Sequence, residues 1–249
     1  DELFKLSNNL FYEGINVNTF IINNKNKCYT KKDDNNIILV KENNIYNIDL
    51  YYIMMFQYKK SNLKDYDIYH EWINEVDMLE KEIVEYNKEY EVIRNSIDFF
   101  IGLAENAIEL ISDYKSLIHR NNDSIGHMLD YKLFANNNIN NPFTFIKTNS
   151  MYDISNYLKY KLLTNNIDYN EIDSIIDNNT EYQNVYLFSC LMYPNIYFDI
   201  VKKILLNSIE ENIIDNIISK VDKYLNMLSY CQNRIKNVKT IKIINWINK

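Results

Sequence analysis

The chain has 249 residues, a formal net charge of −7 at pH 7 and a sequence pI of about 5.1, an acidic balance that argues against a nucleic-acid platform and favours a protein or small-molecule partner. Its three cysteines, Cys28, Cys190 and Cys231, lack the even number and C-x-x-C spacing of a disulfide framework or zinc site, which favours the reducing cytoplasm. No apolar run approaches the roughly 18 residues of a membrane span, so no transmembrane segment is expected.

The beginning of the chain carries a β-like pattern. Short apolar stretches at residues 15–23, 28–30 and 37–41 alternate with Asn- and Asp-rich turns and predict three strands. Three strands are too few for an independent domain. The pattern turns helical after residue 45, so we expect a predominantly α, α+β chain with a β-rich part at 1–45 and a helical part at 46–249.

A long amphipathic pattern runs from Trp72 to Ala104. Apolar residues recur at alternating spacings of four and three, which indicates one very long helix or two collinear helices. A helical hairpin packed into a globular core is favoured over an exposed coiled coil, because Trp and Tyr occupy positions where a zipper has Leu and Ile. The break is predicted at Asn95 and Ser96.

Five further helices are predicted in the second half of the chain, with Asn-rich loops between them. They are expected at residues 151–163, 170–177, 181–192, 196–206 and 209–231. The asparagine cluster at 136–141 is predicted to be a mobile loop.

Several common catalytic signatures are absent from the sequence. The only glycines, Gly14, Gly102 and Gly126, are isolated, so no glycine-rich phosphate loop is present. The histidines lack H-E-x-x-H spacing and no G-x-S-x-G turn occurs, which leaves no positive sign of a zinc protease or a serine hydrolase.

An ordered set of segments does stand out. They are residues 97–110, 117–121, 141–147, 151–159 and 190–199. In this order the chain resembles the spore-coat CotS/YutH group, relatives of aminoglycoside phosphotransferases and choline kinases with a protein-kinase-like fold. The resemblance runs from about residue 14 to 230 and is distinctive only between 97 and 199.

The resemblance implies a partial N-terminal lobe at 1–45 and a helical C-terminal lobe at 46–249. Lys41 would end the strand that leads to the hinge between the lobes, which makes it a candidate nucleotide-binding position. Because the chain begins at Asp1, without an initiator methionine, we expect the glycine-bearing hairpin and the phosphate-pairing lysine of the family to precede it.

The family's catalytic loop is degenerate in this sequence. Active relatives carry His-x-Asp, an Asn about five residues later, and a magnesium-binding Asp after a short strand. Here His119, Arg120 and Asn121 stand at the loop, Asn141 follows only after an insertion, and the strand predicted at 143–147 ends at Thr148. Without the two carboxylates, magnesium and the transferred phosphoryl group lack their electrostatic support.

These substitutions favour a pseudokinase that acts in binding or scaffolding, in the cytoplasm or, if the resemblance extends to function, in a spore coat. No cofactor is expected; ATP and magnesium would bind only if activity is retained. One alternative is an atypical ATP-dependent phosphotransferase that uses Asp123 or Asp153. Another is an all-helical interaction module unrelated to kinases, with the first strands as a cap.

Asp153 has a simpler interpretation than metal binding. Ser150 to Asp153 has the S-x-x-D form of a capping box, which places the carboxylate in the first turn of a helix. Solvated loop acids are likewise the simpler interpretation of Asp123 and Asp130.

Two further hypotheses concern basic residues. Arg120 either pairs with a buried carboxylate, for which the resemblance suggests Glu105, or binds an anion. The tail from Arg234 to Lys249 is basic and amphipathic. We favour docking of this tail on its own protein over binding to a membrane or to an acidic groove.

Overall fold

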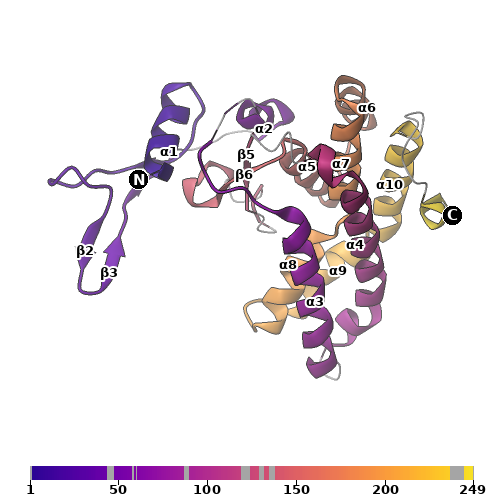
Figure 1. Ribbon diagram of the computed structural model, residues 1–249. Coiled ribbons are helices and arrows are strands. Elements are labelled where there is room, and N and C mark those ends of the chain that lie inside the picture. Colours follow the sequence, from indigo (N-terminus) through magenta and orange to yellow (C-terminus); the bar gives the residue numbers. More distant parts are fainter. Residues whose placement is uncertain are drawn as a thin grey trace. The chain divides into compact units, whose positions relative to one another are not determined.

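The computed structural model describes residues 2–43, 48–57, 59, 61–86, 90–118, 124–128, 132–134, 138–235 and 244–248. These residues form an α+β chain that is predominantly helical (Figure 1). It divides into two compact units, residues 1–66 with 122–150 and residues 67–121 with 151–249. This division differs from the predicted one at residue 45, because residues 122–150 pack with the beginning of the chain.

The first unit combines short helices with paired strands. Its elements are α1 (Glu2–Tyr12), β1 (Thr19–Phe20), β2 (Thr30–Lys32), β3 (Asn35–Ile37), β4 (Val40–Lys41), α2 (Leu50–Gln57), β5 (Ser124–His127), η2 (Asn138–Asn140), η3 (Pro142–Thr144) and β6 (Phe145–Thr148). Within the described residues, β1 pairs with β4, β2 with β3 and β5 with β6, each antiparallel.

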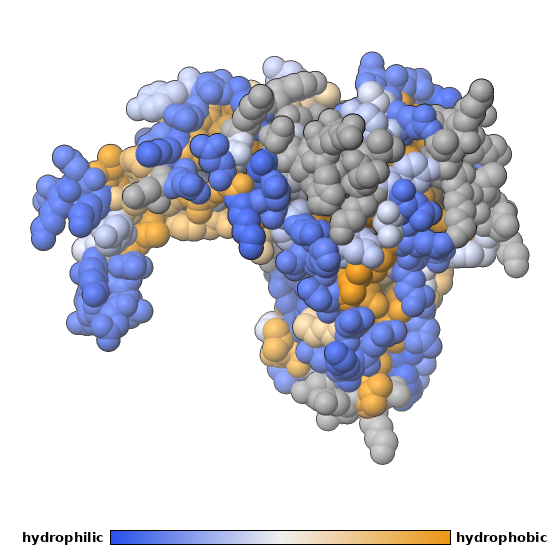
Figure 2. Space-filling view, viewed as in Figure 1, coloured by the Kyte–Doolittle hydropathy of each residue, from blue (hydrophilic) through white to orange (hydrophobic). Residues whose placement is uncertain are grey.

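The strands near the start of the chain are shorter than predicted. Four strands of two or three residues replace the three expected at 15–23, 28–30 and 37–41, and helix α1 precedes them. Asn26 and Asp33 adopt positive φ angles of 56° and 55°, which turn the backbone and limit strand length. The β2–β3 hairpin that results is exposed, and its residues are mostly hydrophilic (Figure 2).

The β5–β6 hairpin is held by an aromatic cluster. Phe56 of α2 lies edge-on to His127, at 4.8 Å between ring centroids, and at 5.9 Å from Phe145. Such aromatic contacts stabilise beyond their buried area. The strand predicted at 143–147 is confirmed with a shift of two residues, since residues 142–144 form the 3-10 turn η3.

The loop predicted at 136–141 contains a short, packed 3-10 turn in its described part, and its mobility stays a prediction. Residues 138–140 form η2, where Ile139 is fully buried and Asn140 nearly so. The carbonyl of Asn140 accepts a hydrogen bond from the backbone N–H of Asn18 at 2.8 Å, and this contact fixes the segment beside β1.

The second unit contains helices and no strands among its described residues. Its elements are α3 (Ile68–Tyr86), α4 (Glu91–Ile118), α5 (Met151–Leu163), α6 (Tyr169–Asn178), α7 (Glu181–Met192), α8 (Asn195–Leu205), η4 (Glu211–Ile214), α9 (Asp215–Ile218), α10 (Val221–Ile235) and η5 (Asn245–Asn248). Helix α7 is buried over almost its whole length and packs against α4, α5 and α10, so it forms the centre of the core.

The predicted helical hairpin is confirmed by the packing of α3 against α4. The predicted break at Asn95 and Ser96 is wrong, since both residues lie inside α4. The Ser96 hydroxyl bonds to the carbonyl of Val92 at 2.7 Å, which satisfies it within the helix. Helix α4 instead begins at Glu91, where the Glu211 carboxylate accepts the backbone N–H of Val92 at 3.0 Å and caps the positive helix end.

The boundaries of the later helices agree closely with the predictions, with one exception. The helix predicted at 209–231 is divided into η4, α9 and α10. The Ser219 hydroxyl donates to the carbonyl of Asn216 at 3.2 Å. Such local bonds compete with helix continuation and favour a turn before α10.

The described end of the chain docks on its own unit, as predicted. The Gln232 side chain accepts the Ile244 N–H at 2.9 Å and donates to its carbonyl at 3.3 Å. Ile244 and Ile247 are buried, and Arg234 forms ion pairs with Asp173 and Asp177 of α6. The tail lysines between 236 and 243 lie outside the described residues.

The paired amide contacts of Gln232 predict a measurable stability effect. Replacement by alanine leaves the N–H and the carbonyl of buried Ile244 without these partners, so Gln232→Ala should lower the free energy of unfolding by about 1–3 kcal/mol. Urea denaturation checks this. The neighbouring exposed Asn233→Ala is the control and should change stability by less than about 0.5 kcal/mol; equal effects of both variants would contradict the assignment.

Candidate functional site

The predicted loop residues fall on different parts of the chain. His119, Arg120 and Asn121 lie outside the described residues, as do Asp123 and Asp130. Lys41, Asn141 and Thr148 belong to the first unit, whereas Asp153 and Glu105 belong to the second. The predicted catalytic constellation therefore stays a prediction, as does the pairing of Arg120 with Glu105, an exposed residue of α4.

Asn141 caps the 3-10 turn η3. Its side-chain oxygen accepts the backbone N–H of Phe143 at 3.1 Å and caps η3. Asparagine is favoured at such positions because its short amide reaches an unpaired N–H. Lys41 is exposed and pairs with Thr19 in the strand ladder, and its predicted role at a hinge stays a prediction.

Thr148 occupies the end of β6, opposite Ser124 in the ladder. The residue is fully buried, and its hydroxyl oxygen has no hydrogen-bond partner within the described part of the chain. The position predicted to have lost a metal-binding carboxylate is thus a buried, uncharged side chain.

Asp153 lies in the first turn of α5, as the capping-box pattern predicts, and is only 3% exposed. A carboxylate at the start of a helix interacts favourably with the positive end of the helix dipole. The cap itself stays a prediction.

Helix α5 also brings an unusual group into the core of the second unit. Lys159 is 5% exposed, and its ammonium group donates to the carbonyl of Tyr193 and to the side-chain oxygen of Asn195, both at 2.7 Å. No carboxylate forms an ion pair with it within the described residues. Burial lowers the pKa of Lys159 from 10.5 to about 7, and the neighbouring Cys190 opposes this shift.

The partners of Lys159 lie in the turn between α7 and α8. Tyr193 precedes Pro194, and the proline ring disfavours helical geometry at the residue before it. Helix α7 therefore ends at Met192, and Tyr193 adopts an extended conformation at φ −68° and ψ 119°. Its carbonyl lies at the negative end of the helix, where a cation is stabilised.

Further polar contacts fix this turn from two sides. The Asn195 amide donates to the side chain of Asn156 on α5 at 2.6 Å. The Tyr193 ring stacks on Trp72 of α3 at 4.0 Å between centroids, and its hydroxyl bonds to Glu75 at 2.6 Å. The turn thus connects α3 and α5 with the ends of α7 and α8.

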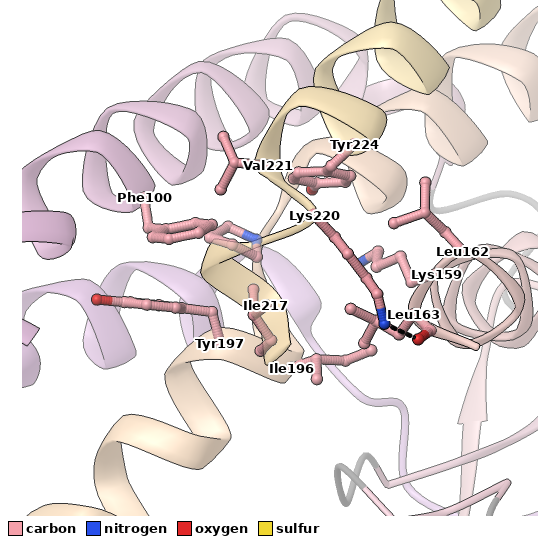
Figure 3. A pocket seen from close by; sticks show the side chains of 11 residues that line it. Phe100, Lys159, Leu162, Leu163, Ile196, Tyr197, Ile217, Lys220, Val221 and Tyr224 are labelled. Atoms are coloured by element: carbon pink, nitrogen blue, oxygen red, sulfur yellow. Dashed lines mark hydrogen bonds between the residues drawn. The ribbon is translucent and has the colours of Figure 1, made fainter. Parts of the chain in front are cut away.

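A pocket lies beside Lys159 (Figure 3). The cavity has a volume of about 40 Å³. It is lined by Phe100, Lys159, Leu162, Leu163, Pro194, Ile196, Tyr197, Ile217, Lys220, Val221 and Tyr224. The walls are mostly apolar, and the lining includes no acidic side chain.

Lys159 and Lys220 were not predicted as site residues. Lys159 sits among apolar and aromatic neighbours in a helix, and such a lysine is usually solvated. Pro194 does predict that α7 ends just before it and leaves a carbonyl outside the helix. The sequence does not show that this carbonyl pairs with a lysine of α5, because that contact is tertiary.

Comparison with protein-family models, with curated proteins and with solved structures found no match. Among the described residues, no helix has the length and apolar character to cross a membrane. The same residues contain no group of three or more His, Cys, Asp and Glu side chains suited to a metal ion.

The lowered pKa of Lys159 predicts a distinctive pH dependence. Above about pH 7 the native state loses this proton while the unfolded chain keeps it, so the contribution of Lys159 to stability rises with pH. The free energy of unfolding of the wild type, relative to Lys159→Met, should increase between about pH 7 and 8.5 by at most about 1.4 kcal/mol per pH unit.

Denaturation at several pH values, with the exposed Lys223→Met as the control, measures this difference. A constant difference between wild type and Lys159→Met over that range would show that Lys159 keeps an ordinary pKa.

Proposed function

We propose that this protein is a binding or scaffolding protein built on a kinase-like fold that has lost efficient phosphoryl transfer. The observation that carries the proposal is Thr148, a fully buried and uncharged residue at the end of β6. In the active relatives implied by the resemblance, this position holds magnesium through a carboxylate.

The surroundings of Thr148 support this interpretation. A metal-binding carboxylate must be accessible to its ion, since burial of an unpaired charge is strongly unfavourable. Thr148 and the following Asn149 are at most 1% exposed. The threonine hydroxyl could not replace a carboxylate as a counter-charge for magnesium.

The order of elements also supports the proposal. A helical hairpin, α3 and α4, precedes the β5–β6 hairpin, which leads directly into the buried helix α5. This order fits the resemblance, in which the metal position follows a short strand. An all-helical module with strands only at its start would lack the β5–β6 hairpin.

The atypical phosphotransferase has less support. Asp153, its candidate metal ligand, is 3% exposed in the first turn of α5, and Asp123 lies outside the described residues. A cytoplasmic or spore-coat setting, and a protein partner, follow from the sequence and the resemblance alone.

Nucleotide titration of the full-length protein tests the proposal. We expect ATP with magnesium to give no phosphoryl transfer to water or to small alcohols and amines, and to shift the melting temperature no more than ATP alone, because no magnesium-dependent binding adds to native-state stability. Thermal denaturation and phosphate release measure the two effects.

The Asp153→Asn variant distinguishes the atypical phosphotransferase from the proposed binding protein. If magnesium and ATP together stabilise the wild type by several degrees, with turnover that Asp153→Asn abolishes and the exposed control Asp222→Asn retains, the protein is an enzyme and the proposal is wrong.

A further inference from the structure

We propose that this chain associates with a second copy of itself, and that a lysine-rich arm of one copy docks on an acidic face of helix α4 of the other. The arm is formed by residues 21–41 of the first unit. The acidic face is formed by four side chains of the second unit, Asp98, Glu105, Glu109 and Asp113. Neither surface depends on the resemblance to kinases, so this association goes beyond the proposed function.

The arm carries apolar side chains that its own unit does not bury. Five of them are between 38% and 60% exposed, namely Ile21, Ile22, Ile37, Ile38 and Leu39. The backbone N–H of Ile21 donates to the carbonyl of Leu39 at 2.9 Å, so these two residues lie on neighbouring chain segments. Figure 2 shows hydrophobic side chains beside the hydrophilic ones on this arm. Apolar side chains that gather on an exposed surface with a polar rim are typical of a protein interaction site.

The loop at the start of the arm is held in one conformation by Asn23. Its side-chain oxygen accepts the backbone N–H groups of Lys25 at 2.8 Å and Lys27 at 3.1 Å. Its amide donates to the carbonyl of Tyr29 at 2.7 Å and to the hydroxyl of Thr30 at 3.2 Å. A surface that is ordered before binding loses less conformational entropy when it docks.

The arm is positively charged in an acidic protein. Residues 21–32 contain four lysines and no acidic residue, whereas the whole chain has a net charge of −7. Asp33 and Asp34 follow at the turn of the β2–β3 hairpin, and Lys41 closes the arm. Complementary charge guides partner choice at protein interfaces, so this segment favours an acidic surface.

Helix α4 offers such a surface. Its four acidic residues recur at spacings of seven, four and four, which places them on one face of the helix, and all four are exposed. Residues 95–113 contain no lysine, arginine or histidine, so this stretch has a charge of −4 that matches the four lysines of the arm. Ile101 and Ile108 are partly buried at the border of this face and offer apolar contact.

Gly102 gives independent support for a partner at this face. It lies in the interior of α4, between Asp98 and Glu105, where glycine destabilises a helix relative to alanine. A Cβ atom added to Gly102 would meet no atom of the chain within 4 Å, so packing within the protein does not require glycine there. Close approach of another backbone is a common reason for glycine at such a position, and a docked arm supplies that backbone.

A second copy of the chain fits these surfaces because both charges are present in one sequence. Contact between two arms would bring lysines together, and contact between two α4 faces would bring carboxylates together. The arm of one copy therefore has to meet α4 of the other. A two-fold axis makes this contact twice and closes the assembly as a dimer, the commonest symmetric oligomer.

Sedimentation equilibrium of the full chain tests this association. We expect a mass twice the 30.0 kDa of one chain at low ionic strength, and a dimer that dissociates as salt screens the charges. Lys31→Glu combined with Lys32→Glu should weaken dimer formation at least tenfold, and Glu105→Lys combined with Glu109→Lys should do the same. An equal mixture of these two double variants should form dimers again, because each contact then joins opposite charges.

Two further variants separate docking from folding and from net charge. Gly102→Leu favours the helix and changes no charge, so it should fold and should still abolish the dimer if an arm approaches this face. Lys5→Glu combined with Lys223→Glu changes the net charge as much as the arm variant does. Both of these lysines are exposed and lie outside the arm and α4, so this control should dimerise as the wild type does.

Four results would overturn this association. They are a monomer at all protein concentrations, a dimer that neither charge reversal weakens, a mixture of the two double variants that stays monomeric, and a dimer that Gly102→Leu leaves intact. A monomer that binds phosphatidylserine vesicles or single-stranded DNA through Lys31 and Lys32 would replace the second copy by that partner. None of these outcomes bears on phosphoryl transfer, so each leaves the proposed function to its own test.

Discussion

The helical unit depends on the contact between Lys159 and the turn that joins α7 to α8. Helix α7 is the buried centre of this unit, and Pro194 forces it to end inside the core. The carbonyl of Tyr193 at this end accepts the backbone N–H of Asn195 at 2.9 Å. Lys159 donates a second hydrogen bond to this carbonyl from α5, and it also donates to the Asn195 side chain at the start of α8.

The same contact explains why an amine is buried in the core of the helical unit. Solvating a lysine is normally easier than burying it, and the lowered pKa of Lys159 records that cost. Two hydrogen bonds offset part of it. The packing of α5 against the end of α7 therefore places a titratable group in the core of this unit.

Local sequence signals predicted the elements better than their connections. Helices α5 and α7 begin and end where the apolar periodicity and the proline indicate. The break placed at Ser96 was wrong because Tyr197, distant in sequence, and the Val92 carbonyl satisfy this hydroxyl inside α4. Lys159 was missed for the same reason, since its partners are 34 and 36 residues away. The degenerate loop at His119 lies outside the described residues, so its interpretation stays a prediction.

A double-mutant cycle between Lys159 and Asn195 tests the central contact most directly. The free energies of unfolding of the wild type, Lys159→Met, Asn195→Ala and the double variant, measured near pH 6, give the coupling energy of the pair. If the lysine and the turn hold each other in place, the coupling should exceed about 1 kcal/mol, within the range for directly contacting residues. A coupling below about 0.3 kcal/mol would mean that the two side chains act independently and that α7 and α8 are held together by other contacts.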